Sequence, residues 1–465
     1  MRRSLLVTGA LVGALMSLLG ASRMARAQEA PARVSAGPGV ALATEKVRLE
    51  NGLTVLLAPD NHAPLVSVEV SYAAGAADDP EGKRGLAHLV EHLVATGTRD
   101  VEHPAAELEL AGACRMNART NNDRTAYFET LPPSRLETAL WVESDRMAYA
   151  ASAVTEARVD TERAAVKNEL RDRTRDASLG VVGTFLSREL FPEWHPYELP
   201  LDDAADLGSI HASDVLAFLH TWYSPGNATL AIAGAFEREP TLAAVHRYFD
   251  SIPSREPPKR AALPAWSPSP VKLVIDASVA YDSVAESWLG PAFGTPDDAA
   301  LDLAAAVLAE RLAHSLVAGG MAVSAGARES SMRRASVFSV EVTLAGKGSV
   351  ARAATAIQRS VDELARPVSA EDLDRAREVW CRHILAVLET PWARAGRMIV
   401  EGDAGQAVGA AFDWGLGRYN VLTADDVARA VSTWLARSRR VTTFVLSRRE
   451  APQRGVLQQR LADDP

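Results

Sequence analysis

Cysteine is scarce in this sequence of 465 residues, which contains only Cys114 and Cys381. Two cysteines so far apart exclude a disulfide-dense scaffold, and although export would permit a pairing, we expect two buried free thiols. No histidine accompanies Cys114 in its segment, and neither a Gly-x-Ser-x-Gly elbow nor a phosphate-binding glycine loop occurs. The sequence therefore offers no motif for cysteine, serine or nucleotide chemistry.

Long hydrophobic runs are lacking after the N-terminus, so no later segment is long and apolar enough to span a bilayer. At the N-terminus, Met1–Arg3 precede an apolar run that reaches Ala21 and ends in small residues at Ala27. This pattern predicts a cleavable signal peptide over residues 1–27 and a periplasmic or secreted protein that begins at Gln28. A single membrane anchor is the alternative, but the run is short and broken by glycines.

Positive charge is in deficit. The 50 lysines and arginines are outnumbered by 59 acidic residues, and loss of the four arginines in residues 1–27 would make the net charge of −9 four units more negative. An acidic protein is a poor candidate for nucleic-acid binding, so no such partner is expected. The charge would favour basic peptides in a cavity, but surface solubility explains it equally well.

The strongest motif that is present is the pentapeptide His-Leu-Val-Glu-His at residues 88–92. Apolar spacing across Gly85–Thr98 predicts a helix, which places His88 and His92 four residues apart on one face. Two neutral imidazoles and one carboxylate suit zinc and leave its fourth tetrahedral position for water. Glu91 lies where a general base would take a proton from that water. Because chance also produces this pattern, a third ligand is required.

A second helix is predicted over Thr155–Arg175, with Thr155 as its N-cap. Glu162 and Glu169 are seven residues apart and share one of its faces. A solvated helix with paired charges would explain an arbitrary glutamate there, so the spacing alone assigns no ligand. The expected buried stripe comprises Val159, Val166 and Leu170.

Together these segments resemble the pitrilysin and insulinase family, which includes mitochondrial processing peptidase. The family pairs His-x-x-Glu-His with a glutamate on a later helix, and here 76 residues separate His92 from Glu169. The resemblance runs from about residue 44 to about residue 450 and is strong only in the first half. Its other landmarks are Asn51–Asp60, Gly112–Pro132, Ala139–Ala148, His195–Pro200 and Trp222–Gly234.

The resemblance implies a role for each residue of the metal site. Glu169 would be the third zinc ligand beside His88 and His92. Glu162 would not bind the metal but would contact and orient a ligand side chain, as a neighbouring acid does in the family. Glu91 would activate the zinc-bound water.

A substrate-binding edge is implied by the segment that resembles the family's Asn-Ala strand. Asn117 and Ala118 would bind an extended peptide by adding it to a sheet edge, so that the main chain supplies affinity independent of sequence. From the residues alone, an interior strand with Asn117 bonded locally is the alternative.

Length and composition predict two domains, since each half opens with strand-like alternation, continues into helices and closes near a Trp-led strand. We expect an α+β fold with two homologous α/β-sandwich domains, each a mixed sheet flanked by helices, in a clamshell arrangement. The expected parts are a signal peptide (1–27), a linker (28–43), a metal-binding peptidase domain (44–251), a linker with six prolines (252–270), a homologous domain without metal (271–450) and a tail (451–465).

The second half carries no metal motif. In Leu301–Ala327, the counterpart of the metal helix, His314 has no spaced partner. Active family members commonly have an arginine and then a tyrosine after this helix, which hold substrate and oxyanion. Val317 and Val323 stand at about those places, and valine donates no hydrogen bond. The resemblance thus implies a homologous partner chain, in a heterodimer or homodimer, that completes the site.

The sequence as a whole predicts an exported zinc metalloendopeptidase that cleaves unfolded peptides or small proteins. Two other functions are open. A homologous scaffold or binding subunit would keep the fold without the chemistry, although the complete metal set argues against it. A zinc hydrolase of non-peptide substrates would have no use for a peptide-binding edge strand.

Overall fold

The computed structural model describes residues 44–176, 178–198, 206–277, 279–346, 348–403, 417–447 and 457–462. The expected signal peptide (1–27) and the linker after it (28–43) lie outside the described residues. Among those described, no helix has the length and apolarity that a membrane crossing requires.

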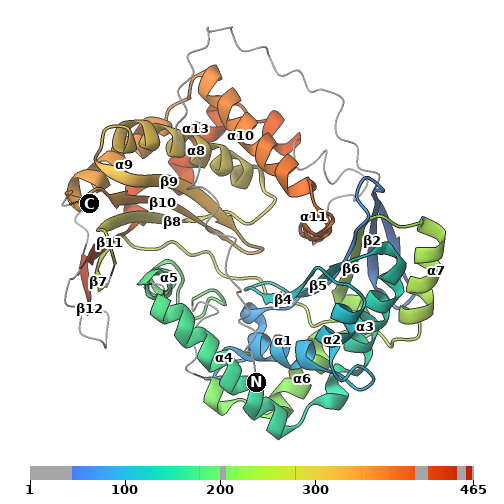
Figure 1. Cartoon of the computed structure of the whole chain (residues 1–465). Helices are drawn as coiled ribbons and strands as arrows, with labels where there is room; N and C mark the ends of the chain where they lie inside the picture. The colour runs from blue at the N-terminus through green and yellow to red at the C-terminus, as the bar shows by residue number, and fades with distance from the viewer. Residues whose placement is uncertain are drawn as a thin grey trace. The chain divides into compact units, whose positions relative to one another are not determined.

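The first sheet has six strands in the order β1-β2-β6-β3-β5-β4 (Figure 1). Its pairs are antiparallel except β2 with β6, which run parallel. Every residue of β3 and β5 is buried, as expected for central strands covered on both faces. The strands are β1 (Glu45–Arg48), β2 (Thr54–Pro59), β3 (Val66–Tyr72), β4 (Arg115–Thr120), β5 (Thr125–Leu131) and β6 (Ala228–Gly234).

The second sheet repeats this topology in the order β12-β7-β11-β8-β10-β9, with β7 and β11 as its parallel pair. The predicted duplication of two α/β units is therefore confirmed, whereas the clamshell arrangement stays a prediction. Strand β12 takes the place of β1 and extends this sheet into the residues expected to form a tail. The strands are β7 (Val271–Ala277), β8 (Ser283–Gly290), β9 (Ala322–Ser331), β10 (Ser336–Leu344), β11 (Val441–Ser447) and β12 (Leu457–Ala462).

Helices flank both sheets (Figure 1). Those of the first half are α1 (Leu86–Thr96), α2 (Pro104–Leu110), α3 (Leu136–Tyr149), α4 (Glu156–Asp176), α5 (Ser178–Leu190), α6 (Ala212–Trp222) and α7 (Arg238–Phe249). Those of the second half are α8 (Pro296–Leu312), α9 (Val350–Leu364), α10 (Ala370–Leu388), α11 (Pro391–Asp403) and α13 (Ala424–Trp434). A π-helical turn, Ala313–Val317, continues α8. Short 3-10 turns lie at Ala76–Asp78, Pro133–Arg135, Ala150–Ala153, Leu207–Ser209, Pro225–Asn227 and Arg437–Arg439.

A helix of each half also packs on the sheet of the other half. One face of the first sheet packs with α1 and α3, while apolar residues of its other face, such as Leu56 and Ala231, pack against Met398 and Ile399 of α11. In return, α5 packs on β7, β8 and β11 of the second sheet. Because a sheet needs cover on both faces to bury its apolar residues, the two halves stabilise one another. The expected domain boundaries remain a prediction.

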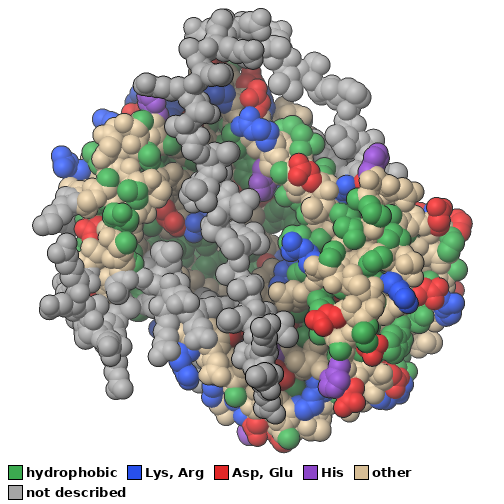
Figure 2. Space-filling view, viewed as in Figure 1, with side chains coloured by type: hydrophobic (Ala, Val, Ile, Leu, Met, Phe, Trp, Pro, Cys, Tyr) green, Lys and Arg blue, Asp and Glu red, His purple; other side chains and the backbone are tan. Residues whose placement is uncertain are grey.

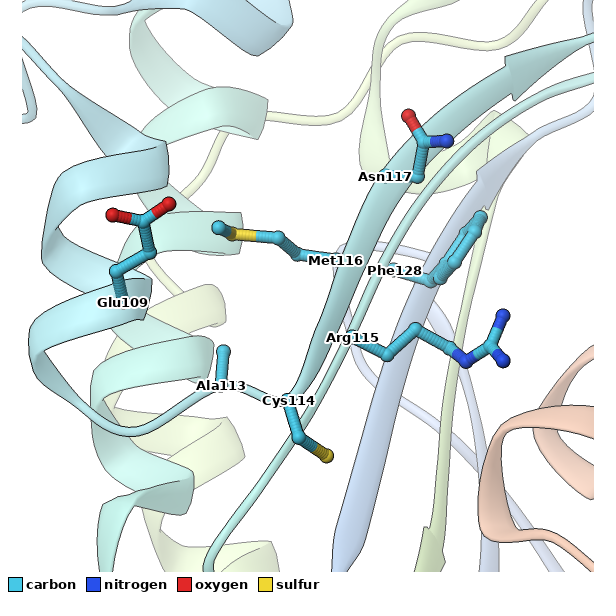
Figure 3. A pocket seen from close by; sticks show the side chains of 7 residues that line it. All are labelled: Glu109, Ala113, Cys114, Arg115, Met116, Asn117 and Phe128. Atoms are coloured by element: carbon cyan, nitrogen blue, oxygen red, sulfur yellow. The ribbon is translucent and has the colours of Figure 1, made fainter. Parts of the chain in front are cut away.

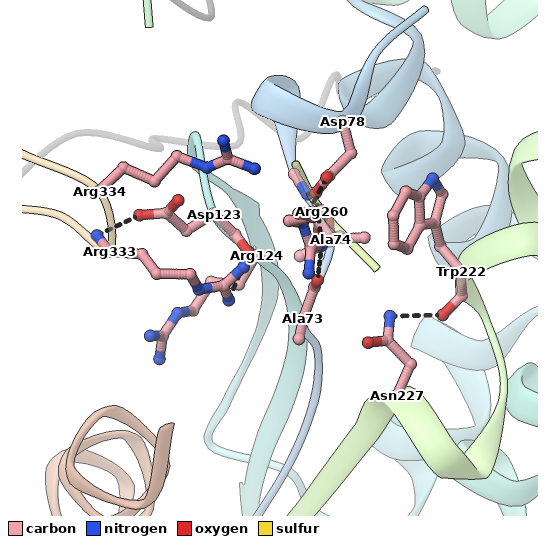
Figure 4. A network of polar contacts seen from close by, with 12 residues as sticks. Ala73, Ala74, Asp78, Asp123, Arg124, Trp222, Asn227, Arg260, Arg333 and Arg334 are labelled. Atoms are coloured by element: carbon pink, nitrogen blue, oxygen red, sulfur yellow. Dashed lines mark hydrogen bonds and ion pairs between the residues drawn. The ribbon is translucent and has the colours of Figure 1, made fainter. Parts of the chain in front are cut away.

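The Pro-rich segment between the halves, residues 253–270, contains no helix or strand. Arg260 anchors it, since its guanidinium forms an ion pair with Asp78, donates to the Ala73 carbonyl and lies 4.6 Å from the centre of the Trp222 ring (Figure 4). Further on, Trp266 Nε1 donates to the Leu190 carbonyl over 2.7 Å. The connector therefore has no regular secondary structure and is held in place by specific contacts.

Charge is spread over the described surface. On the face that Figure 2 shows, acidic and basic side chains are interspersed, and no large patch of one sign forms among the described residues. The acidic excess is therefore not concentrated on this face.

Candidate metal centre

Helix α1 carries the pentapeptide and is fixed at both ends. At its start, the Asp79 carboxylate accepts hydrogen bonds of 2.8 Å from the N–H groups of Gly85 and Ala87, which would otherwise lack intrahelical partners. At its end, Gly97 has φ 151, and a side chain there would meet the Glu102 carbonyl. The helix therefore holds its buried histidine and glutamate in a defined place.

Helix α4 lies against α1 and is the one predicted from the second acidic segment. Its stripe of Val159, Val166 and Leu170 is buried, as expected. The link between the two helices is Arg158, which donates to the carbonyls of Leu93 at 3.0 Å and Gly97 at 3.1 Å, in the last turn of α1. The last carbonyls of a helix lack backbone N–H partners within it, so a cation there is favourable. The sequence did not predict the role of Arg158, because its partners are 61 and 65 residues away.

The structure brings the three predicted ligands together. One ligand atom from each of His88, His92 and Glu169 lies within 4.8 Å of the other two. Glu169 is 3.2 Å from His92 Nε2 and 3.8 Å from His88 Nε2. Glu162 is 3.5 Å from His92 Nδ1, the opposite nitrogen of the same ring. Two imidazole nitrogens and one carboxylate oxygen fit zinc, and an acid behind a ligand imidazole fixes its orientation.

The carboxylates change the protonation of His92 when no metal is bound. Burial lowers the pKa of His92, but hydrogen bonds with Glu162 and Glu169 and the charge of Glu91 outweigh burial and raise the pKa to about 9. The metal-free site therefore prefers a proton at neutral pH, and a cation is favoured at this point. A metal ion would take the place of that proton.

Glu91 is buried and has a specific partner. The hydroxyl of Thr120, the last residue of β4, donates to Glu91 Oε2 over 2.5 Å. Thr120 also lies 3.2 Å from the Thr125 hydroxyl on the adjacent strand. Thr120 lies within the family landmark Gly112–Pro132, but its contact with Glu91 spans 29 residues and no local pattern predicts it.

Strand β4 ends the first sheet among the described strands, so one of its edges is open. Asn121 N–H donates to Arg124 O in the turn to β5, and the register then leaves the N–H and C=O groups of Met116, Ala118 and Thr120 on the open edge. Asn117 Oδ1 accepts from the Ala118 N–H over 2.9 Å. Asn117 is thus on an edge strand, so the alternative of an interior strand was wrong, although the side chain is bonded locally as that alternative held. Peptide binding by Asn117 and Ala118 stays a prediction.

The two cysteines are free, but the expectation that both are buried was wrong. Cys114 is exposed and Cys381 is half-buried. Cys114 directly precedes the edge strand β4, where no further described strand covers it, and Cys381 lies on α10 in a partly exposed position. The order of apolar residues in the sequence does not reveal which strand will be an edge.

Family models match both halves of the chain. Residues 54–189 match the model described as "Insulinase (Peptidase family M16)", and residues 209–379 match the one described as "Peptidase M16 inactive domain". The chain belongs to the pitrilysin and insulinase family. The resemblance stated from the sequence is therefore confirmed.

Curated relatives of this M16 chain are distant. It is 26% identical to the zinc protease PqqE of Helicobacter pylori over 277 residues, which is 57% of this chain and 61% of the relative. It is 27% identical to the probable mitochondrial-processing peptidase subunit beta of Arabidopsis thaliana over 265 residues, 56% of this chain and 49% of the relative. The chain thus spans about half to three fifths of the length of these relatives.

Solved structures share the M16 fold over most of the chain. A protease from Helicobacter pylori has a TM-score of 0.77 at 22% identity, covering 87% of this chain and 99% of that one. The periplasmic protease PqqL of Escherichia coli has a TM-score of 0.74 at 16% identity, covering 87% of this chain and 48% of that one. At such identities the likeness establishes the fold alone.

The second half of this M16 chain has no metal ligands where the first half has them. Helix α8 occupies the place of α1 between corresponding strands, and its third and seventh residues are Asp298 and Asp302, where α1 has His88 and His92. The sixth residue of α8 is Leu301, where α1 has Glu91. The metal set is therefore confined, among the described residues, to the first half.

The two valines expected at the family's arginine and tyrosine positions lie around the end of the same helix. Val317 closes the π-helical turn and is partly buried. Val323 lies on the edge strand β9 and is 47% exposed. Neither side chain has a hydrogen-bond donor to offer.

Proposed function

We propose that this chain is a zinc-dependent endopeptidase of extended peptides, with His88, His92 and Glu169 as the metal ligands. The observation that carries the proposal is the convergence of these three side chains within 4.8 Å, beside the Glu91 carboxylate and the open edge of β4. When bound, zinc would acidify a water molecule and polarise the carbonyl of the peptide bond. The donor set of two imidazoles and one carboxylate suits that ion.

Glu91 is proposed as the general base. It is buried, so its carboxylate is poorly screened by solvent, and its Oε2 is occupied by the Thr120 hydroxyl. The other carboxylate oxygen takes the proton from water and passes it to the nitrogen of the departing amine. Thr120 holds the carboxylate at one orientation while this happens. Glu162 plays a corresponding part for the His92 ring, since it contacts the nitrogen that faces away from Glu169.

The open edge of β4 is proposed to bind the substrate main chain. A peptide that adds to this edge would take its hydrogen bonds from Met116, Ala118 and Thr120. Asn117 Oδ1 now accepts from the Ala118 N–H, so a peptide carbonyl must replace it there. Thr120 belongs both to this edge and to the Glu91 contact, which brings the bound peptide to the proposed base.

Export and a homologous partner chain are part of the proposal. The predicted signal peptide supports export, and a structural neighbour is a periplasmic protease by its title. The valines at 317 and 323 support a partner, because this chain then lacks the donors that would stabilise an oxyanion. A relative at 27% identity is by its name one subunit of a processing peptidase.

A second candidate is a subunit without chemistry. It is favoured by the same two valines and by a relative at 25% identity, human cytochrome b-c1 complex subunit 1, which is by its name part of an assembly. The complete metal set speaks for the peptidase.

The deciding experiment compares the purified chain, alone and with a candidate homologous partner, on a mixed peptide library. We expect about one zinc per chain, cleavage that a chelator abolishes and added zinc restores, and a marked gain with the partner. A chain that binds zinc but cleaves nothing in either setting would favour the subunit without chemistry. Full cleavage by the chain alone would remove the partner from the proposal.

A further inference from the structure

A cavity of about 380 Å³ lies along the edge strand β4, next to the proposed peptide-binding residues (Figure 3). It belongs neither to the metal cluster nor to the Glu91 contact. Its lining residues are Glu109, Ala113, Cys114, Arg115, Met116, Asn117 and Phe128.

The cavity reaches both faces of the sheet at its edge. Met116 packs with the core that contains α1 and α3, and in Figure 3 it points toward the helix that bears Glu109. Arg115 and Asn117 have the opposite parity, and Asn117 is paired with Phe128, so these three side chains lie on the other face. A strand that lies along this edge therefore meets Glu109 on one face and Arg115 on the other.

The two charged residues of the cavity are available to a ligand. Both are exposed, and neither has an ion pair with another described residue. The Arg115 guanidinium lies 4.5 Å from the centre of the Trp392 ring, a contact that orients it without neutralising it. The neighbouring Arg119, by contrast, is held by Glu69.

We propose that this cavity is a charge-selective subsite, which binds a basic side chain at Glu109 and an acidic one at Arg115 from adjacent residues of an extended peptide. Adjacent residues are required because consecutive side chains of a strand point to opposite faces. The inference rests on the proposed function, and it narrows the substrate class to peptides with a neighbouring basic and acidic residue.

The place of the subsite along the substrate follows from strand geometry. Met116 and Arg115 are four and five residues from Thr120, which contacts the proposed base. At about 3.3 Å per residue, the charged pair is roughly 15 Å from that contact. The selected residues therefore lie about four or five positions from the cleaved bond, and the subsite acts on KM more than on kcat.

Cleavage-site mapping tests the subsite. The zinc-loaded chain, with its partner where needed, cuts a mixed peptide library, and mass spectrometry counts charged residues at each distance from the cut. We expect about threefold enrichment of Lys or Arg at one position and of Asp or Glu at the next, as is typical of exposed pairs. Glu109→Lys reverses the first preference, and Arg115→Glu reverses the second.

Matched controls separate local from general charge effects. Glu107→Lys makes the same change on an exposed residue of α2 that does not line the cavity. Arg48→Glu does so on the exposed face of β1, the opposite edge strand of the same sheet. Both controls should leave the profile unchanged. Normal cleavage with flat charge frequencies at these positions overturns the subsite.

A binding measurement keeps the test independent of turnover, so that failure of cleavage challenges only the proposed function. Zinc-loaded Glu91→Gln protein is titrated with a fluorescent peptide of alternating Lys and Glu and with its all-Gln counterpart. We expect the charged peptide to bind about three to ten times more tightly at low salt. Adding Glu109→Gln and Arg115→Gln should make the two affinities equal. Equal affinities without those changes overturn the proposal.

Discussion

Helices α1 and α8 occupy the same place in two sheets of the same strand order, yet they use it differently. In α1, His88 and Glu91 are buried and His92 is partly buried, and the two histidines meet the acidic residues of α4. In α8, Asp298 and Asp302 stand at the histidine positions and are occupied by other parts of the second half: Arg418 forms an ion pair with Asp298, and the Tyr419 hydroxyl donates to Asp302 over 2.7 Å.

The two halves can also be compared at the ends of β4 and β9, where each strand ends in a hydroxyl-bearing residue. Thr120, the last residue of β4, donates to Glu91, and Ser331, the last residue of β9, donates to Asp298 over 2.6 Å. In both halves, a hydroxyl at the end of a strand thus donates to a carboxylate on an earlier helix. In the first half that carboxylate lies beside a metal set, whereas in the second half it is bound by an arginine. The same framework supports a site in one half and an internal ion pair in the other.

The largest expected difference between the halves is in turnover. Glu91→Gln should lower peptide cleavage by about three orders of magnitude or more while zinc stays bound, because the amide cannot accept a proton. Asp302→Asn, on the matching helix, should leave cleavage within about twofold. Single-turnover assays with elemental analysis measure both. Comparable losses in the two variants would contradict the assignment of chemistry to the first half.

The free energy of unfolding should depend on the second half instead. Arg418→Ala leaves the buried Asp298 without its cation and should destabilise the protein by about 3–5 kcal/mol, since an uncompensated buried charge is costly. Zinc content of the folded fraction should not change. Denaturant unfolding of the zinc-loaded protein gives the free energy, with Arg429→Ala, at an exposed ion pair with Asp297, as the control. A loss no greater than in the control would refute a stabilising role for the Arg418 contact.

Metal retention sharpens the comparison within the first half. Glu169→Gln should weaken zinc binding by about 10- to 100-fold or more, because one anionic ligand is lost. Glu156→Gln, on an exposed residue of the same helix, is the matched control. Competition with a zinc chelator measures the affinities. Unchanged retention in Glu169→Gln would exclude it as a ligand.

Thr120 provides a smaller test. Thr120→Val removes the hydroxyl donated to Glu91 at nearly constant volume and should lower kcat about tenfold, with zinc content unchanged. Thr120→Ser should restore most of the activity. An equal defect in the serine variant would show that packing of the methyl group, not the hydroxyl, matters.

The mildest difference is in the pH dependence of folding. In the zinc-free protein the pKa of His92 is raised to about 9, so its stabilising effect is complete below pH 6.5 and is lost as pH rises toward 9. Burial and the charge of Asp298 raise the pKa of Asp302 to about 7. The contribution of this group to the free energy of unfolding is therefore lost as pH rises from 3.8 to 7. Melting curves of His92→Gln and Asp302→Asn, each compared with the unchanged chain, should differ in these separate windows. If both variants differed from the unchanged chain over the same pH range, the assignment of the two ranges to His92 and Asp302 would be contradicted.

The sequence predicted what depends on local spacing. The pentapeptide fixed the ligand-bearing face of α1, and the stripe of α4 is buried where periodicity placed it. It did not predict Thr120, Arg158 or the exposure of Cys114, because these depend on which distant segments become neighbours. Strand β12 escaped prediction for the same reason, since β7, its partner, is far away in the sequence.

Because α11 covers one face of the first sheet, that face stays exposed until late in synthesis. The last strand of that sheet is complete at residue 234, but its cover is made only when residue 403 has been translated. At roughly 5 to 20 residues per second, the apolar face that contains Leu56 and Ala231 stays uncovered for about 10 to 30 s on the ribosome. A nascent first half is therefore an intermediate with an exposed apolar face. Any molecule that binds this face during that interval must dissociate before α11 can pack on it.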